Sequence, residues 1–171
     1  TVVGLHQLPL DAEVLAHSHE LADLRIATPE GRQVPYLLER RDEPMELPLV
    51  IAGATAEDGP LPTAGTRPTV SRYAIALPYS GLPAGRLAIA TSSRLFDRRI
   101  AVRRGVRDEA TGARRWLTVA NLDWRHADPE SVAPELALDL PALATDRLLL
   151  EVEEGDDLPG REVACEPELP G

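Results

Sequence analysis

Apolar and polar residues alternate along much of this chain, with the period of two that is typical of strands with one buried face. Residues 21–28 show the pattern clearly, because Leu24 and Ile26 fall on one face while Asp23 and Arg25 fall on the other. The period of 3.6 residues expected of long amphipathic helices does not dominate anywhere. The pattern therefore predicts a fold built mainly from strands.

A tight turn separates residues 21–28 from a second alternating segment, 33–40. In the turn Thr28-Pro29-Glu30-Gly31, the proline fixes φ at the second position and the glycine closes the turn. Pro35 has no N–H to donate to a neighbouring strand, so the second segment is expected at a sheet edge or near a bulge. Together the two segments predict a β-hairpin.

Further segments of strand length follow, separated by stretches rich in glycine and proline. Short helical turns are expected only at 12–19 and 140–145. We therefore predict an all-β fold, an antiparallel β-sandwich or jelly roll. The remaining expected strands are 46–52, 69–77, 86–91, 98–104, 115–120, 135–140 and 147–153.

Residues 53–68 are the best candidate for a linker, because they are rich in Gly, Pro, Ala and Thr and lack periodicity. One interpretation is a boundary, with an N-terminal strand set or small β-domain at 1–66 and a sandwich domain at 67–171. This division would allow two small sandwiches. The other interpretation is a long crossover inside a single jelly roll.

The composition supports a globular domain and disfavours two kinds of partner. Apolar residues make up 43% of the chain but aromatic residues only 4%, so the core must consist mainly of Leu, Val, Ile and Ala. The longest uncharged apolar run, 47–56, is half the ~20 residues that a membrane helix needs. The net charge of −10 disfavours nucleic acid, because phosphate binding relies on a basic surface.

Cys165 is the only cysteine, which excludes an internal disulfide.

Charge is unevenly distributed between two segments. Basic residues, all arginine, crowd residues 94–115, whereas acidic residues dominate 151–168. One interpretation is that the two segments face each other as neighbouring strands or loops, and this is the one we favour. The alternative is an arginine-lined site for an anionic ligand.

Two polar clusters could hold a metal ion. His17-Ser18-His19-Glu20 places two imidazoles close together, with Glu20 or His6 able to complete a site. Asp156 and Asp157 follow an apolar segment and could form a structural Ca²⁺ site, since Ca²⁺ prefers clustered oxygen ligands. A solvated loop and an ordinary acidic turn are the simpler interpretations, which we favour. No cofactor other than this possible Ca²⁺ is expected.

The two tryptophans receive different predictions. Trp116 alternates within an expected strand and is predicted to pack in the core. Trp124 lies in 121–129, which we expect to be a polar loop, where Trp124, Arg125 and His126, with Tyr79, could form a glycan-binding surface. The alternative, which we favour, is that Trp124 covers the open end of the core.

Motifs of catalysis are absent from the sequence. We find no G-x-S-x-G, no phosphate-binding glycine loop and no H-E-x-x-H. Carboxylate pairs suited to glycoside hydrolysis are inevitable among 28 acidic residues, so their presence decides nothing. We therefore predict no catalytic residues and rank a hydrolase last among the hypotheses.

Two stretches resemble known families. Residues 21–26 with Gly31 and 34–36, "LADLRI … G … VPY", resemble a signature of bacterial extracytoplasmic proteins of uncharacterised function, some with a C-terminal membrane anchor. Residues 96–102, Trp116 and 147–152, followed by 155–157, resemble galactose-binding-like, discoidin-type sandwiches. The resemblance implies a periplasmic or cell-surface location and no catalytic role. Any membrane anchoring would require residues outside this chain.

These observations lead to two main hypotheses about function. The first is a non-catalytic extracytoplasmic module that binds a protein partner in a bacterial envelope. The second is a carbohydrate-binding module that contacts glycans through loops at one end of the sandwich.

Overall fold

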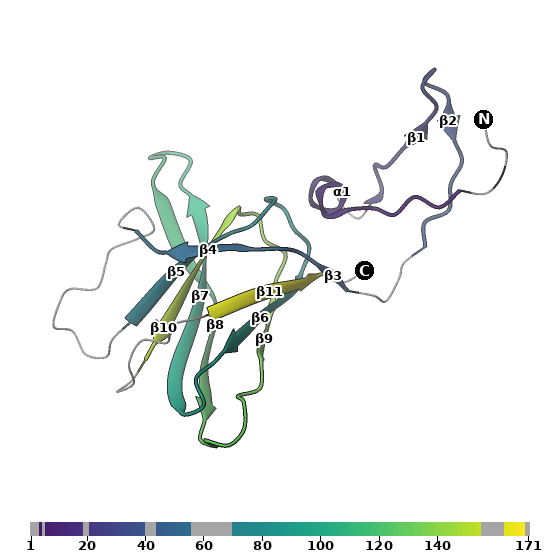
Figure 1. Cartoon of the computed structure of the whole chain (residues 1–171). Coiled ribbons are helices and arrows are strands. Elements are labelled where there is room, and N and C mark those ends of the chain that lie inside the picture. The colour runs from purple at the N-terminus through teal and green to yellow at the C-terminus, as the bar shows by residue number, and fades with distance from the viewer. Residues whose placement is uncertain are drawn as a thin grey trace.

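The computed structural model describes residues 4, 6–18, 21–39, 44–55, 70–154 and 163–169, the last range through its backbone alone (Figure 1). It is mostly β-structure with one short α-helix, as the alternation predicts. Two antiparallel sheets face each other and share one core, which fits a β-sandwich. No helix within the described residues has the length and hydrophobicity of a membrane span.

The larger sheet has five strands in the order β4-β5-β10-β7-β8, and the smaller has four in the order β3-β11-β6-β9. Every neighbouring pair is antiparallel. The larger sheet comprises β4 (Val50–Gly53), β5 (Val70–Ala76), β10 (Arg147–Glu153), β7 (Phe96–Arg107) and β8 (Arg114–His126). The smaller comprises β3 (Met45–Glu46), β11 (Val163–Leu169), β6 (Gly85–Thr91) and β9 (Leu136–Leu140).

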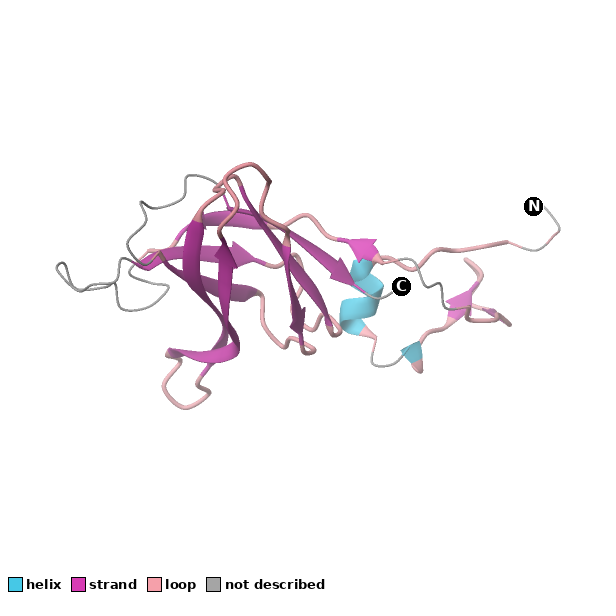
Figure 2. Cartoon of the chain, turned by 90° about the horizontal axis from the view of Figure 1, so that it is seen from below, coloured by secondary structure: helices cyan, strands magenta, loops and turns pink. Residues whose placement is uncertain are grey.

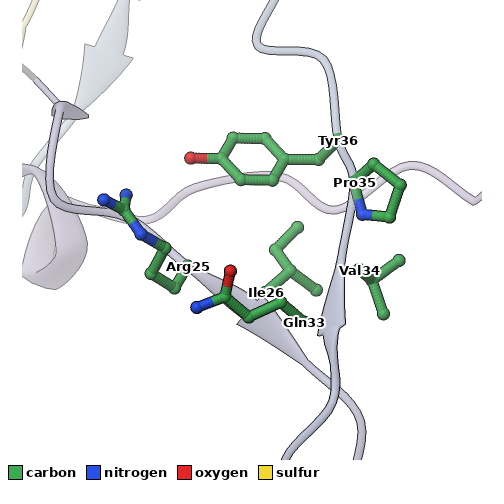
Figure 3. Close-up of a pocket in the computed structure, with 6 residues that line it drawn as sticks. All are labelled: Arg25, Ile26, Gln33, Val34, Pro35 and Tyr36. Atoms are coloured by element: carbon green, nitrogen blue, oxygen red, sulfur yellow. The ribbon is translucent and has the colours of Figure 1, made fainter.

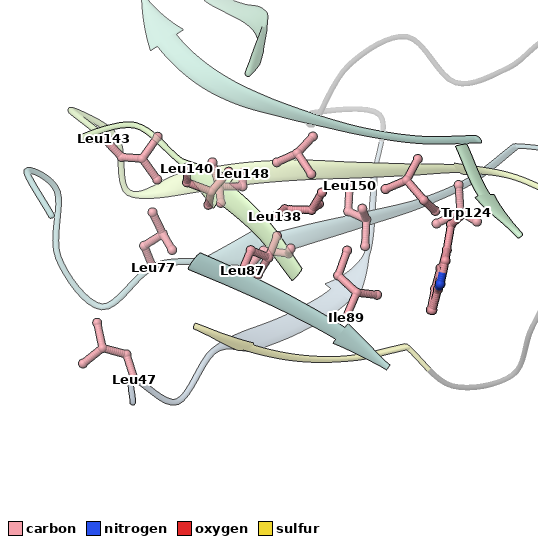
Figure 4. Packing of buried hydrophobic residues seen from close by; sticks show 14 of the residues in the cluster. Leu47, Leu77, Leu87, Ile89, Trp124, Leu138, Leu140, Leu143, Leu148 and Leu150 are labelled. Carbon is pink, nitrogen blue, oxygen red and sulfur yellow. The ribbon is translucent and has the colours of Figure 1, made fainter. Parts of the chain in front are cut away.

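The core lies between the two sheets and is almost entirely aliphatic (Figure 4). Alternate residues of the central strands point into it, as expected for sheets with one buried face. Burying these side chains provides the main driving force for folding, at about 1.5–3 kcal/mol for each fully buried one. Its most buried apolar members are Ile75, Leu87, Ile89, Ile100, Val102, Leu148 and Leu150.

The two longest strands extend well beyond their predicted bounds. β7 and β8 pair from Phe96↔His126 to Arg107↔Arg114, so the expected loop at 121–129 is strand as far as His126. Alternating charges misled the prediction, because on the solvent face of a sheet they form cross-strand ion pairs. Arg125 contacts Asp97 at 3.1 Å and Arg99 contacts Asp123 at 3.3 Å.

The expected helical turn at 140–145 does not form. Leu143 instead makes an isolated antiparallel bridge with Leu82. Its N–H donates to the carbonyl of Leu82 at 2.9 Å, and its carbonyl accepts the N–H of Gly81 at 2.8 Å. Both leucines are buried in the common core. Their side chains therefore close the end of the sandwich, and burial outweighs the local preference for a turn of helix.

The predicted boundary at residue 66 does not separate two sets of strands. β3 pairs with β11 and β4 pairs with β5, so strands from 45–53 complete both sheets of the sandwich. The described residues share one core and not two. Most of the expected linker, 56–68, lies outside the described residues.

The arginine-rich and acidic segments do lie beside each other, as the favoured interpretation predicted. β10 pairs with β7 from Leu148↔Arg104 to Glu153↔Arg99. Glu151 contacts Arg103 at 2.6 Å and Arg72 at 2.8 Å. Beyond the end of β10, Glu154 contacts Arg98 at 2.8 Å, with both side chains buried.

Helix α1 (Ala12–His17) lies at one end of the sandwich (Figure 2). Asp11 caps it by accepting the N–H of Val14 at 3.0 Å. Ala12 and Ala16 pack against the common core. Gly81 has φ +90, and a Cβ there would lie 2.7 Å from the carbonyl oxygen of Ala16, so this turn needs glycine to let the helix approach.

Candidate functional site

A small hairpin lies beyond α1, apart from both sheets of the sandwich (Figures 1 and 2). It consists of β1 (Ile26–Ala27) and β2 (Gln33–Val34), which pair with each other and with no other described strand. The register is Ile26↔Val34 and Ala27↔Gln33. The hairpin predicted from 21–40 is therefore confirmed, although its ladder is shorter than the alternation suggested.

The turn forms for the local reasons that the sequence indicates. The N–H of Gly31 donates to the carbonyl of Thr28 at 2.8 Å, and the N–H of Thr28 donates to the carbonyl of Arg32 at 2.8 Å. Gly31 has φ +83, a conformation that glycine adopts without a steric penalty. These bonds set the register that places Ile26 opposite Val34.

Side chains tie the two arms together below the short ladder. The Tyr36 hydroxyl donates to the carbonyl of Leu24 at 2.8 Å. The guanidinium of Arg25 donates to the same carbonyl at 2.6 Å and to that of Ala22 at 3.2 Å. Tyr36 thus links the two arms, while the bonds of Arg25 lie within its own arm.

An open pocket of about 460 Å³ lies between these arms (Figure 3). Arg25 and Ile26 line it from one arm, and residues 33–36 line it from the other. All six lining residues are exposed to solvent. The wall is mostly apolar, and its polar groups are the guanidinium of Arg25, the amide of Gln33 and the hydroxyl of Tyr36.

Several apolar side chains of the hairpin are largely exposed to solvent. Leu37 is 93% exposed and Leu38 is 45% exposed, while Ile26, Val34 and Tyr36 lie near 40%. We call these five residues the hairpin patch. Isolated exposed apolar residues are ordinary on protein surfaces, but contiguous groups mark sites of interaction.

The hairpin that carries the patch also has little structural support of its own. A two-stranded hairpin is at best marginally stable alone, and usually needs a third strand or a packed layer. Here the described residues provide neither, because neither strand of the hairpin belongs to a sheet of the sandwich. A partner surface would therefore supply the burial that the hairpin lacks.

The predicted glycan site is not assembled as expected. Trp124 belongs to β8, is 6% exposed and packs edge-to-face on Phe96 with ring centroids 4.9 Å apart. It covers the core, as the favoured alternative held, and presents no open ring face for stacking on a sugar. Arg125 points to the opposite face, where it pairs with Asp97.

His126 is the last residue of β8, and its ring is hydrogen-bonded to residues of two neighbouring loops. Its Nδ1 is hydrogen-bonded to the carbonyl of Arg94, and its Nε2 lies 3.3 Å from the hydroxyl of Ser131. That hydroxyl donates to Asp128 at 2.7 Å and, with the N–H of Glu130, lowers the pKa of Asp128. Asp128 thus contacts the serine and not the histidine, an order that differs from a catalytic triad.

Tyr79 lies far from these residues. β5 and β7 are both antiparallel to β10 and therefore run in the same direction. The last residue of β5 thus lies at the opposite end of the sheet from Phe96, which begins β7, and from its partner His126. Tyr79 follows β5 and instead makes an edge contact with His17 of α1, with centroids 6.3 Å apart. The four predicted ligand-binding residues are therefore divided between two ends of the sandwich.

The predicted metal clusters fall largely outside the described residues, which exclude His19, Glu20, Asp156 and Asp157. His17 is described, and its Nδ1 lies 2.8 Å from the carbonyl of Glu13 in α1. Within the described parts of the chain, no three His, Cys, Asp or Glu side chains form a group suited to a metal ion.

Two exposed features of the molecule were not predicted from the sequence. The hairpin patch could have been found from Leu37-Leu38, since adjacent leucines in a strand pattern cannot share one buried face. Trp116, predicted to be in the core, lies half-buried on the outer face of the larger sheet beside Arg114. Its alternation with arginine gave a weak signal of that position.

Comparison of the chain with family models, curated proteins and solved structures finds no match.

Proposed function

We propose that this protein is a non-catalytic interaction module whose N-terminal hairpin binds an extended strand of a protein partner. One observation carries the proposal: the five apolar residues of the hairpin patch are exposed on a two-stranded unit that pairs only with itself. A third strand would bury those side chains and extend the ladder, a common mode of peptide recognition.

The open backbone edges favour a strand over other apolar partners. In a two-stranded sheet each strand has one edge with N–H and C=O groups that no neighbouring strand uses. Full burial of a side chain such as Leu37 or Leu38 contributes about 1.5–3 kcal/mol before the cost of association. A few such residues with several backbone bonds would suffice for a stable complex.

Residues Arg25 and Gln33 suit this role as polar contacts at the margin of the patch. Arg25 already binds two carbonyls of its own chain, which keeps its guanidinium beside the pocket. Interfaces combine an apolar centre with a polar rim that sets orientation. We expect affinity to depend on the leucines and selectivity on these two side chains.

We further propose that the module acts outside the cytoplasm, in a bacterial cell envelope, and that its sandwich is of the galactose-binding-like type. The resemblance of 21–36 to extracytoplasmic proteins supports the first point. The resemblance of 96–102 and 147–152 to discoidin-type sandwiches supports the second, and an all-β fold agrees with it. A structural Ca²⁺ at Asp156 and Asp157 stays a prediction.

The test compares two pairs of exposed apolar residues. Leu37→Ser/Leu38→Ser alters the hairpin patch, whereas Leu95→Ser/Val132→Thr alters residues of similar exposure on the sandwich. A partner captured from envelope extract is identified, purified and titrated against both variants. We expect at least a tenfold loss of affinity for the hairpin variant alone.

Hydrogen exchange then locates the interface. Binding should slow exchange of the amides in β1 and β2, because a third strand protects an open edge. Equal affinity of both variants, or protection confined to the sandwich, would show that the hairpin is not the binding element.

A further inference from the structure

The solvent side of the larger sheet carries a second candidate surface, separate from the hairpin patch. Leu148, Leu150 and Val152 of β10 point into the core, so Leu149 and Glu151 face the opposite side. The ladder places residues of β5, β7 and β8 beside them on that side. We call its arginine-rich part the arginine face: Arg72, Arg103, Arg107, Arg114, Trp116 and Glu151.

The arginine face carries an excess of positive charge in a chain whose net charge is −10. Its one carboxylate, Glu151, is shared between Arg72 and Arg103 at 2.8 and 2.6 Å. The side chain of Glu151 is 10% exposed, while that of Arg103 is 39% exposed. Some N–H groups of the Arg103 guanidinium therefore remain exposed to solvent, while Glu151 fixes the position of that guanidinium.

Arg107 and Arg114 lie opposite each other near the end of the β7–β8 ribbon. Neither forms an ion pair with a carboxylate in the part of the chain that the structure describes. Asp108 of the adjoining turn is engaged elsewhere, since it accepts the N–H groups of Ala110 and Thr111 at 3.0 Å. The ribbon thus presents two guanidinium groups that form no ion pair with any carboxylate of the described residues.

Trp116 completes this surface and orders part of it. The guanidinium carbon of Arg114 lies 5.9 Å from the centroid of the Trp116 ring, within reach of a cation–π contact. Both side chains lie over Gly105, where a Cβ would come within 3.1 Å of Arg114 and 3.4 Å of Trp116. Glycine therefore lets both side chains approach the backbone of β7 closely.

We infer that the arginine face binds a carboxylate-bearing polysaccharide of the polyuronate class. Guanidinium groups bind carboxylates through paired, charge-assisted hydrogen bonds, and Arg103 and Arg107 are about 13 Å apart along β7 at 3.3 Å per residue. A polyuronate repeats carboxylates along a stiff chain, so little entropy is lost on binding. The C–H faces of its sugar rings match the half-buried ring of Trp116.

An acidic peptide would match the charge but not the other features. Its flexible backbone would lose more conformational entropy on a flat surface, and it offers Trp116 no rigid apolar face. The polysaccharide is therefore the occupant that both the arginines and the tryptophan favour. This inference is independent of the hairpin patch.

The test measures binding of the whole chain to polygalacturonate by calorimetry, with dextran as a neutral polysaccharide and polyglutamate as an acidic peptide. We expect binding to polygalacturonate, none to dextran, and at least tenfold weaker binding to polyglutamate. Affinity for polygalacturonate should fall as salt is raised, because charge pairing contributes to it. Polyglutamate binding of equal strength would overturn the proposed ligand class.

Two double variants separate this face from general charge effects. Arg107→Ala/Arg114→Ala should weaken polygalacturonate binding at least tenfold, since it removes two charged hydrogen-bond donors. Arg32→Ala/Arg86→Ala removes the same charge elsewhere and should leave affinity within twofold. If the two double variants weaken binding equally, the arginine face is not the binding site. If Arg107→Ala/Arg114→Ala does not fold, the single variant Arg107→Gln replaces it in the comparison.

Discussion

The chain contains two β-hairpins that differ in what supports them. The β1–β2 hairpin has two residues in each strand and exposes most of its apolar side chains. The β7–β8 hairpin has strands of 12 and 13 residues, and β7 is flanked by β10 over half its length. Both begin from tight turns, so turn chemistry alone does not decide how far a ladder extends.

Burial on one face accounts for the difference. Ile100 and Val102 of β7 are almost fully buried, and each adds to the free energy that holds the long ribbon in place. Ile26 and Val34 also face each other across their ladder, yet both remain exposed. The comparison teaches that the short hairpin is formed by its turn and by Tyr36, whereas the long one is formed by the core.

The largest loss of stability is expected from breaking the ion pair between Arg98 of β7 and Glu154, which follows β10. Glu154→Ala should lower the free energy of unfolding by about 3–5 kcal/mol, because it leaves Arg98 buried without its counter-ion. Urea unfolding followed by tryptophan fluorescence measures this loss. The double variant Arg98→Met/Glu154→Leu is the control, and should recover most of it because apolar residues replace both charges. Equal losses in the two variants would contradict a buried ion pair.

A paired truncation tests the two hairpins directly. Leu150→Ala removes a fully buried side chain of β10 beside β7 and should cost about 2–5 kcal/mol. Val34→Ala, in the exposed ladder, should cost less than about 0.5 kcal/mol. Thermal and urea unfolding measure both values under the same conditions. A comparable cost for Val34→Ala would mean that the short hairpin packs against the sandwich in solution.

The smallest expected change is a pH-dependent loosening of the turn that joins β7 to β8. Hydrogen bonds from the N–H groups of Thr111 and Ala110 lower the pKa of Asp108. The turn should therefore be fully formed above the ordinary pKa of aspartate and should loosen only as the pH falls through the lowered value. NMR shifts of the Ala110 and Thr111 amides during an acid titration report this. A titration at or above the ordinary aspartate pKa would contradict the assignment.

Features that depend on neighbouring residues were predicted well from the sequence. The turn at 28–31 and the helix at 12–17 rest on proline, glycine and an aspartate cap, whose effects extend over a few residues. The pairing of the arginine-rich and acidic segments was also expected. There the prediction succeeded because opposite charges on adjacent strands attract.

Features that depend on distant pairing were predicted poorly. Asn121 to His126 looked like a polar loop, and only the partner strand β7 shows that its polar residues form the solvent face. The register also places Trp116, which was expected in the core, on the outer face of the larger sheet. Strand β11 was not expected at all, since Pro167 and several glutamates obscure its pattern.

The sequence by itself determined that this chain would form short antiparallel strands joined by turns, because side-chain alternation and turn residues act through local backbone preferences. It also determined the first hairpin, whose turn at 28–31 rests on a proline and a glycine. Only the tertiary structure decided which strands become neighbours, and therefore which tryptophan is buried, which arginines meet Glu151, and which apolar side chains no sheet covers. Burial depends on contacts between residues far apart in the chain, which no local pattern specifies.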